Sequence, residues 1–268
     1  MRALLFALLL PACGVADAFD PSARQPGTVP GPDGATLAPA LVDAIHTEAE
    51  KELPAQAAAR PRPYSEVIDD LAAVRKELGR DWMNATTSAA KESVLAEART
   101  TLHEGIVEDL IPPWYGTEWA FYGTSQTPGK GTIACGYFVS TVLRDAGLRV
   151  ERVRLAQQAS SHIARTFAGG ATTWFSNQPH LRVIEHVEEQ GAGLYAIGLD
   201  YHVGLLSFDG VGPVRMCHSS VLWPTSVLCE DAAKSEAMLS TVHVVGEVLT
   251  DRVVEAWIEG KAIVTSTP

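Results

Sequence analysis

The character of the sequence changes at Pro112-Pro113, and this change limits the fold more than any other feature. After the two prolines, glycine, aromatic and β-branched residues become common. Before them, apolar residues recur at helical spacing, as in Val67, Leu71, Val74 and Leu78, and again in Val94, Leu95, Ala98, Leu102, Ile106 and Leu110. A helical region followed by a strand-rich region predicts an α+β fold.

Composition divides the chain into four parts. Residues 1–18 form a signal segment, 19–37 a flexible linker rich in Pro, Gly, Ser and Thr, 38–112 a helical region and 113–268 the main domain. Within the main domain we expect helices at 135–145, 160–167 and 250–259, and strands at 150–155, 194–199, 202–208 and 214–218.

Bulk properties exclude some classes of partner. The chain has 268 residues, of which 46% are hydrophobic, so it can bury a substantial core. Its formal net charge of −11 argues against nucleic acid and against anionic membrane surfaces, because both partners require clustered Lys and Arg.

The first residues predict export to the periplasm or cell envelope. Arg2 precedes a short apolar run, which is too short to cross a membrane. Two processing sites compete. Leu10-Pro11-Ala12-Cys13 is similar to a lipoprotein box with Cys13 as the lipidated residue, which would give the chain its one attachment to a membrane, whereas Ala16-Asp17-Ala18 suits ordinary signal peptidase. Both alternatives stay open.

The remaining cysteines are odd in number for an oxidising compartment. Cys217 and Cys229 bracket a short segment and are candidates for a disulfide. That pairing leaves Cys135 as a reactive thiol. Three buried, inert cysteines are the alternative.

Cys135 opens an apolar helical run, and His202 begins a strand-like run, His202-Val203-Gly204-Leu205-Leu206. Unpaired N–H groups at a helix start stabilise a thiolate, and a neutral imidazole can take the thiol proton. The pair therefore predicts a thiol nucleophile and its base.

The segment from Phe121 to Val139 resembles the nucleophile region of the NlpC-like cysteine peptidases, which are papain-fold enzymes that cleave peptide stems of the bacterial cell wall. The resemblance covers about Trp114 to Ser220. It implies a papain-like domain with the nucleophile helix packed on an antiparallel sheet. It also implies a catalytic triad of Cys135, His202 and His218.

The match departs from the family in two places. Ala134-Cys135-Gly136-Tyr137 replaces the usual Asp-Cys-Ser-Gly. The family's oxyanion tyrosine has only approximate counterparts here, Tyr122 and Trp119, which we take as substrate-binding candidates.

A three-residue turn at Asp209-Gly210-Val211 would place His202 directly across from His218 on one sheet face. A two-residue Asp209-Gly210 turn would send His218 to the other face. We expect the first register or an equivalent bulge.

Together these features predict an exported thiol hydrolase that cleaves an amide bond without a cofactor or metal, and the resemblance implies a peptidoglycan stem peptide as the substrate. A second hypothesis is a catalytically silent envelope lipoprotein that binds such peptides or a protein partner. A third is acyl transfer with the same cysteine and histidine.

Overall fold

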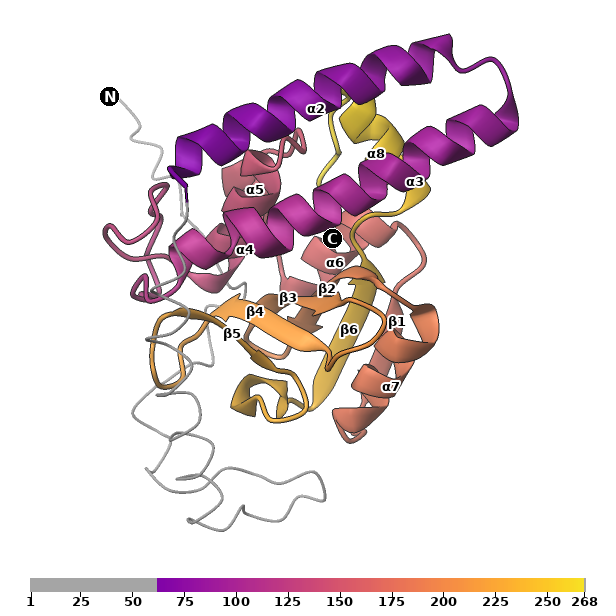
Figure 1. Cartoon of the computed structure of the whole chain (residues 1–268). Coiled ribbons are helices and arrows are strands. Elements are labelled where there is room, and N and C mark those ends of the chain that lie inside the picture. The colour runs from indigo at the N-terminus through magenta and orange to yellow at the C-terminus, as the bar shows by residue number, and fades with distance from the viewer. Residues whose placement is uncertain (1–61, 268) are drawn as a thin grey trace, which may run out of the picture.

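The computed structural model describes residues 62–267 (Figure 1). The helical elements are α2 (Tyr64–Asn84), α3 (Ser88–Glu104), η2 (Gly105–Leu110), η3 (Pro112–Trp114), α4 (Cys135–Asp145), α5 (Arg152–Ala156), α6 (Ser160–Ala168), α7 (Leu181–Gln190), η4 (Glu236–Met238) and α8 (Asp251–Ile258). The strands are β1 (Thr173–Ser176), β2 (Gly193–Leu199), β3 (Val203–Phe208), β4 (Arg215–Ser219), β5 (Val227–Asp231) and β6 (Val242–Glu247). Within the described residues, no helix combines the length and the apolar character needed to cross a membrane. The signal segment, the linker and Cys13 lie outside the described residues.

The strands form one antiparallel sheet in the order β1-β6-β2-β3-β4-β5. Side chains alternate between its faces. One face, with Val203, Leu205 and Cys217, shares a hydrophobic core with α4 and α6. The other face, with Leu206 and Met216, packs with apolar residues of α7. This arrangement of helices and one antiparallel sheet confirms the α+β prediction.

The helical region packs onto the same core as the main domain. Helices α2 and α3 lie side by side along the top of Figure 1, in contact with α8. Val67, Leu71 and Leu102 belong to the cluster that contains Cys135 and Phe138. At the end of α3, His103 Nε2 lies 3.1 Å from Ser207 Oγ of β3. Hydrophobic burial therefore continues across residue 112, and the proposed division there stays a prediction.

Helix α4 has the predicted bounds. Ala134 is extended, with φ −80° and ψ 159°, and its carbonyl accepts the first helical bond from Phe138 N at 2.8 Å. The helix ends before Gly147, whose φ of +92° favours glycine. Every residue of α4 except Arg144 is buried, so the helix runs through the interior.

Other parts of the prediction were wrong or incomplete. The strand expected at 150–155 is wrong, because residues 152–156 form helix α5. The side chain of Arg152 at the start of α5 contacts α4. Its Nε donates to Thr141 Oγ1 at 2.7 Å and its guanidinium lies 4.8 Å from the Tyr137 ring centre. The strands β1, β5 and β6, helix α7 and the short helices η3 and η4 were not predicted.

The β3–β4 connection differs from the predicted three-residue turn. Ser207 pairs with Arg215 and Leu205 with Cys217, so the register is shifted by two residues. The Asp209 carboxylate accepts the N–H groups of Val211 and Gly212 at 2.8 and 2.7 Å, which holds a wider loop. Pro213 has no N–H to donate to a ladder. A shift of two preserves the face of every side chain.

Candidate active site

His202 and His218 form a buried hydrogen-bonded pair. His202 Nε2 lies 2.7 Å from His218 Nδ1, and the rings meet edge to face with centres 4.9 Å apart. The prediction that His202 lies directly across from His218 was wrong. Leu205 pairs with Cys217, and extending this register by one residue puts Gly204, not His202, opposite His218. The two side chains still share one face, which is the geometry that the predicted pair required.

Gly204 provides the space for this pair. A Cβ at position 204 would lie 3.0 Å from Met216 Cε and 3.2 Å from His218 Cβ. Both distances are shorter than ordinary van der Waals contacts. The glycine in His202-Val203-Gly204 thus lets His218 lie against β3.

The second ring nitrogen of His218 contacts a carboxylate. His218 Nε2 lies 3.1 Å from Glu230 Oε1 on β5, and only 1% of the His218 side chain is exposed. Glu230 was not predicted. Its position follows from the β4–β5 register, in which Cys217 pairs with Cys229. His218 and Glu230 each follow one of these cysteines, so both side chains lie on the sheet face opposite the disulfide, as diagonal neighbours.

Burial sets the protonation of these groups. Burial and then the neighbouring His218 charge lower the pKa of His202 well below its ordinary value. For Glu230, burial raises the pKa, but the hydrogen bond and charge of His218, a hydrogen bond from Ser235 and the charge of Arg215 together hold the pKa below its ordinary value. The site therefore favours a neutral His202 and an ionised Glu230.

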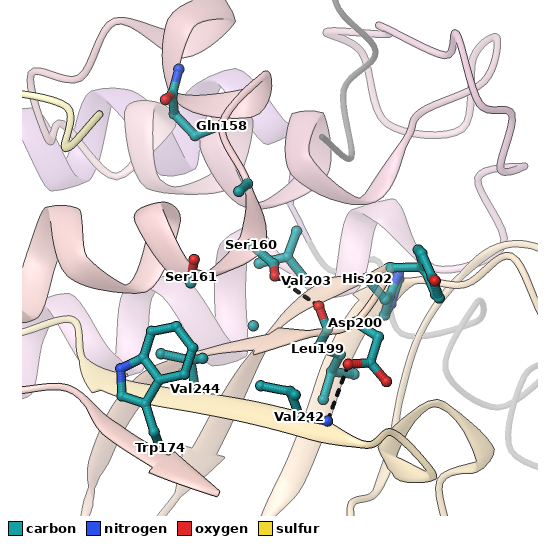
Figure 2. A pocket seen from close by; sticks show the side chains of 13 residues that line it. Gln158, Ser160, Ser161, Trp174, Leu199, Asp200, His202, Val203, Val242 and Val244 are labelled. Carbon is teal, nitrogen blue, oxygen red and sulfur yellow. Dashed lines mark hydrogen bonds between the residues drawn. The ribbon is translucent and has the colours of Figure 1, made fainter. Parts of the chain in front are cut away.

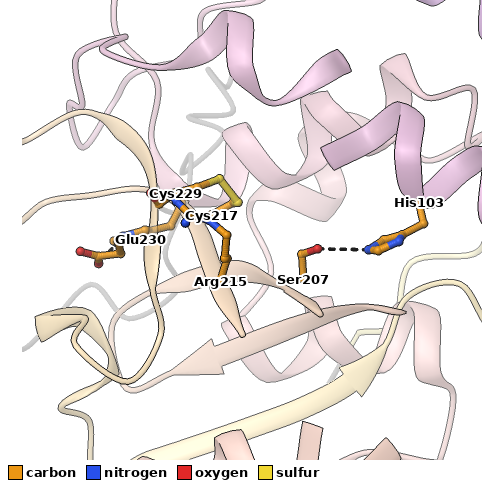
Figure 3. The surroundings of a disulfide bond; sticks show 7 residues. His103, Ser207, Arg215, Cys217, Cys229 and Glu230 are labelled. Carbon is orange, nitrogen blue, oxygen red and sulfur yellow. Dashed lines mark hydrogen bonds and ion pairs between the residues drawn. A yellow bond between two sulfur atoms is a disulfide. The ribbon is translucent and has the colours of Figure 1, made fainter. Parts of the chain in front are cut away.

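The predicted disulfide between Cys217 and Cys229 is confirmed. The two residues are direct partners across β4 and β5, with Cα atoms 4.0 Å apart. Figure 3 shows the bond beside Glu230 and Arg215. It therefore joins the two strands that carry His218 and Glu230.

Cys135 lies at the start of α4 as predicted, but it is not a reactive thiol in this structure. It is disulfide-bonded, and no described cysteine is a thiol. Only 1% of Cys135 is exposed.

A hydrogen bond connects the segment that carries His218 with the segment that precedes Cys135. Ser219 Oγ donates to Ile133 O at 2.6 Å, which ties the residue after His218 to the loop that leads into Cys135. The described hydrogen bonds pair His202 with His218 and leave Cys135 outside this pair. The structure thus pairs His202 with His218, whose side chain lies on the sheet face of Met216, whereas Cys135 and helix α4 pack on the opposite face with Leu205 and Cys217.

A cavity of about 230 Å³ lies beside His202 (Figure 2). Its walls come from the start of α6, the β2–β3 turn, Trp174 and β6. Asp200 in the turn accepts the N–H groups of Thr241 and Val242 at 2.7 and 3.1 Å. The volume is smaller than a typical drug-sized site and suits a group the size of one residue.

The two substrate-binding candidates lie on a different segment. Tyr122 is 82% exposed and packs edge to face on Phe121. Trp119 N donates to Thr225 O at 2.9 Å, while its indole Nε1 is buried without a hydrogen-bond partner. Neither residue lines the cavity beside His202, and their role in binding stays a prediction.

Among residues 62–267, no group of three or more His, Cys, Asp or Glu side chains is placed to hold a metal ion. Comparison with protein-family models, with curated proteins and with solved structures found no match to this chain.

Proposed function

We propose that this chain is an exported thiol hydrolase that cleaves an amide bond in a cell-wall peptide, with Cys135 as nucleophile and His202 as base. The observation that carries the proposal is the buried pair of His202 and His218, joined at 2.7 Å beside a cavity. The substrate class comes from the resemblance to the NlpC-like peptidases.

The hydrogen bond between the histidines supports this role for His202. Its Nε2 is occupied by His218, so Nδ1 is the nitrogen left to act on a thiol. His202 lines the neighbouring cavity, from which a substrate would approach this nitrogen.

The proposed reaction has two steps. His202 Nδ1 takes the Cys135 proton, the sulfur attacks the amide carbonyl, and the proton passes to the leaving amine as the C–N bond breaks. Water, deprotonated by the same nitrogen, then hydrolyses the thioester to a carboxylate and returns the thiol. The Cys135 backbone N–H would donate to the oxyanion, a contribution of about 3 kcal/mol for a well-placed donor.

This chemistry requires that the Cys135 disulfide be open. Either export route predicted from the sequence leaves the processed chain without a Cys13 thiol, because cleavage after Ala18 removes Cys13 and lipidation occupies its sulfur. We propose that the processed chain is the active form.

The test is hydrolysis of purified peptidoglycan by the processed chain, followed by mass spectrometry of the released fragments. Cys135→Ala and His202→Gln should each abolish the release of new amines. His180→Gln is the matched control, because His180 is also buried but bonds a backbone carbonyl, Ala233 O, at 3.0 Å. Hydrolysis that persists in Cys135→Ala would refute the proposal.

The burial and bonding of Cys135 favour a second candidate, a silent envelope protein that binds cell-wall peptide. This candidate predicts that the processed chain binds peptidoglycan fragments without cleaving them. Binding would then be equal in Cys135→Ala and in the unmodified sequence.

A further inference from the structure

We infer that Glu230 is a positioning residue that sets the direction of the hydrogen bonds through His218, so that His202 keeps an unprotonated Nδ1. The consequence for catalysis rests on the proposed function, whereas the hydrogen-bond direction itself does not. Neither the sequence pattern nor the resemblance assigns Glu230 a role.

The argument begins with the carboxylate. An ionised carboxylate has no proton to donate, so it can only accept. Glu230 Oε1 lies 3.1 Å from His218 Nε2, and this nitrogen must therefore carry a proton. In a neutral ring the proton on Nε2 leaves Nδ1 as an acceptor.

The same logic passes to the next ring. His218 Nδ1, now an acceptor, lies 2.7 Å from His202 Nε2, so His202 donates through Nε2. A neutral His202 with its proton on Nε2 has a lone pair on Nδ1. One carboxylate thus fixes both tautomers, and the second fixed tautomer is the one that a general base requires.

The surroundings hold Glu230 in this state. Ser235 donates a hydrogen bond to it, the charge of Arg215 favours its ionised form, and His218 Nε2 lies 3.1 Å from its Oε1. The Cys217–Cys229 bond lies between the strands that carry the contacting side chains. Glu230 is therefore a fixed, ionised acceptor within a buried cluster.

The test measures histidine tautomers by nitrogen NMR on the full chain labelled with ¹⁵N-histidine. In the unmodified sequence, His202 and His218 should both carry the proton on Nε2. In Glu230→Gln the amide has nearly the same shape but can donate or accept, so both rings should become mixtures of tautomers. Asp231→Asn, the next residue of β5, is the control and should leave the spectrum unchanged.

The second measurement is the pH profile of hydrolysis. A carboxylate stabilises the cation that forms when the histidine pair takes a proton, and the other groups facing it, Arg215 and Ser235, are unchanged in the variant. In Glu230→Gln the acid limb should move to lower pH and the maximal rate should fall roughly tenfold or more. A merely structural role would lower the rate without moving the limb.

The outcomes separate the two proposals. Single, unchanged tautomers in Glu230→Gln and Glu230→Ala would overturn the role of Glu230, whether or not the chain is an enzyme. A tautomer change in a chain that never hydrolyses peptidoglycan would leave that role intact and refute the hydrolase.

Discussion

At the scale of single residues, the site depends on the absence of a side chain at Gly204. A Cβ atom at this position would lie only 3.0 Å from Met216 Cε and 3.2 Å from His218 Cβ. The sequence pattern paired His202 with His218, and the structure joins their rings by a hydrogen bond. The pattern could not find Glu230, which becomes a neighbour only when Cys217 and Cys229 are known to face each other across two strands.

Gly204→Ala should destabilise the protein by about 1–3 kcal/mol, as is usual when a methyl group is forced into a packed interior. Urea unfolding of the variant would show a lower midpoint at an unchanged slope. Gly170→Ala is the control, because a Cβ there meets nothing within 4 Å. Equal midpoints for the two variants would mean that the space beside His218 is not needed.

At the scale of elements, the turns limited the prediction more than the helices did. Helix α4 was predicted to its last residue because its apolar pattern is uninterrupted and Gly147 ends it. The β3–β4 register was missed by two residues because the Asp209 side chain bonds, rather than turn length alone, shape that loop. Short α5 and the edge strand β1 carry too little pattern to predict.

Loss of the Cys217–Cys229 bond should weaken the junction of β4 and β5. The bond closes a loop between residues 12 apart in sequence, and a loop of this length contributes about 3 kcal/mol in the chain-entropy model. Replacing both cysteines by alanine should lower the urea midpoint accordingly and mix the tautomers of His218. An unchanged midpoint in the double variant would contradict this assignment.

At the scale of the whole molecule, one hydrophobic core joins the helical region to the sheet. The sequence predicted the order of helices before strands, and from it the α+β class, but not that α2 and α3 share the core of α4. Sequence periodicity gives the apolar face of each helix and leaves its partner undetermined.

Folding stability should fall when the pH drops below about 6.5. Burial is the main cause that lowers the pKa of His103, His202 and His243, so these rings bind protons more readily in the unfolded chain. Their contribution is complete above the ordinary histidine pKa of 6.5 and is lost as the pH falls toward the lowered values. Urea midpoints from pH 7.5 to 5 would show this slope, and His202→Gln should reduce it. A midpoint independent of pH in this range would contradict the account.

The most direct test of the central claim is the rate of Cys135 alkylation against pH, resolved by mass spectrometry. The full chain would carry Cys13→Ser, with the number of thiols counted first. We predict an ionisation limb well below the ordinary thiol value of about 8.5, which moves toward that value in His202→Gln. A Cys135 that stays unreactive, or one that gives the same limb near 8.5 in both chains, would contradict the claim that an imidazole activates this sulfur.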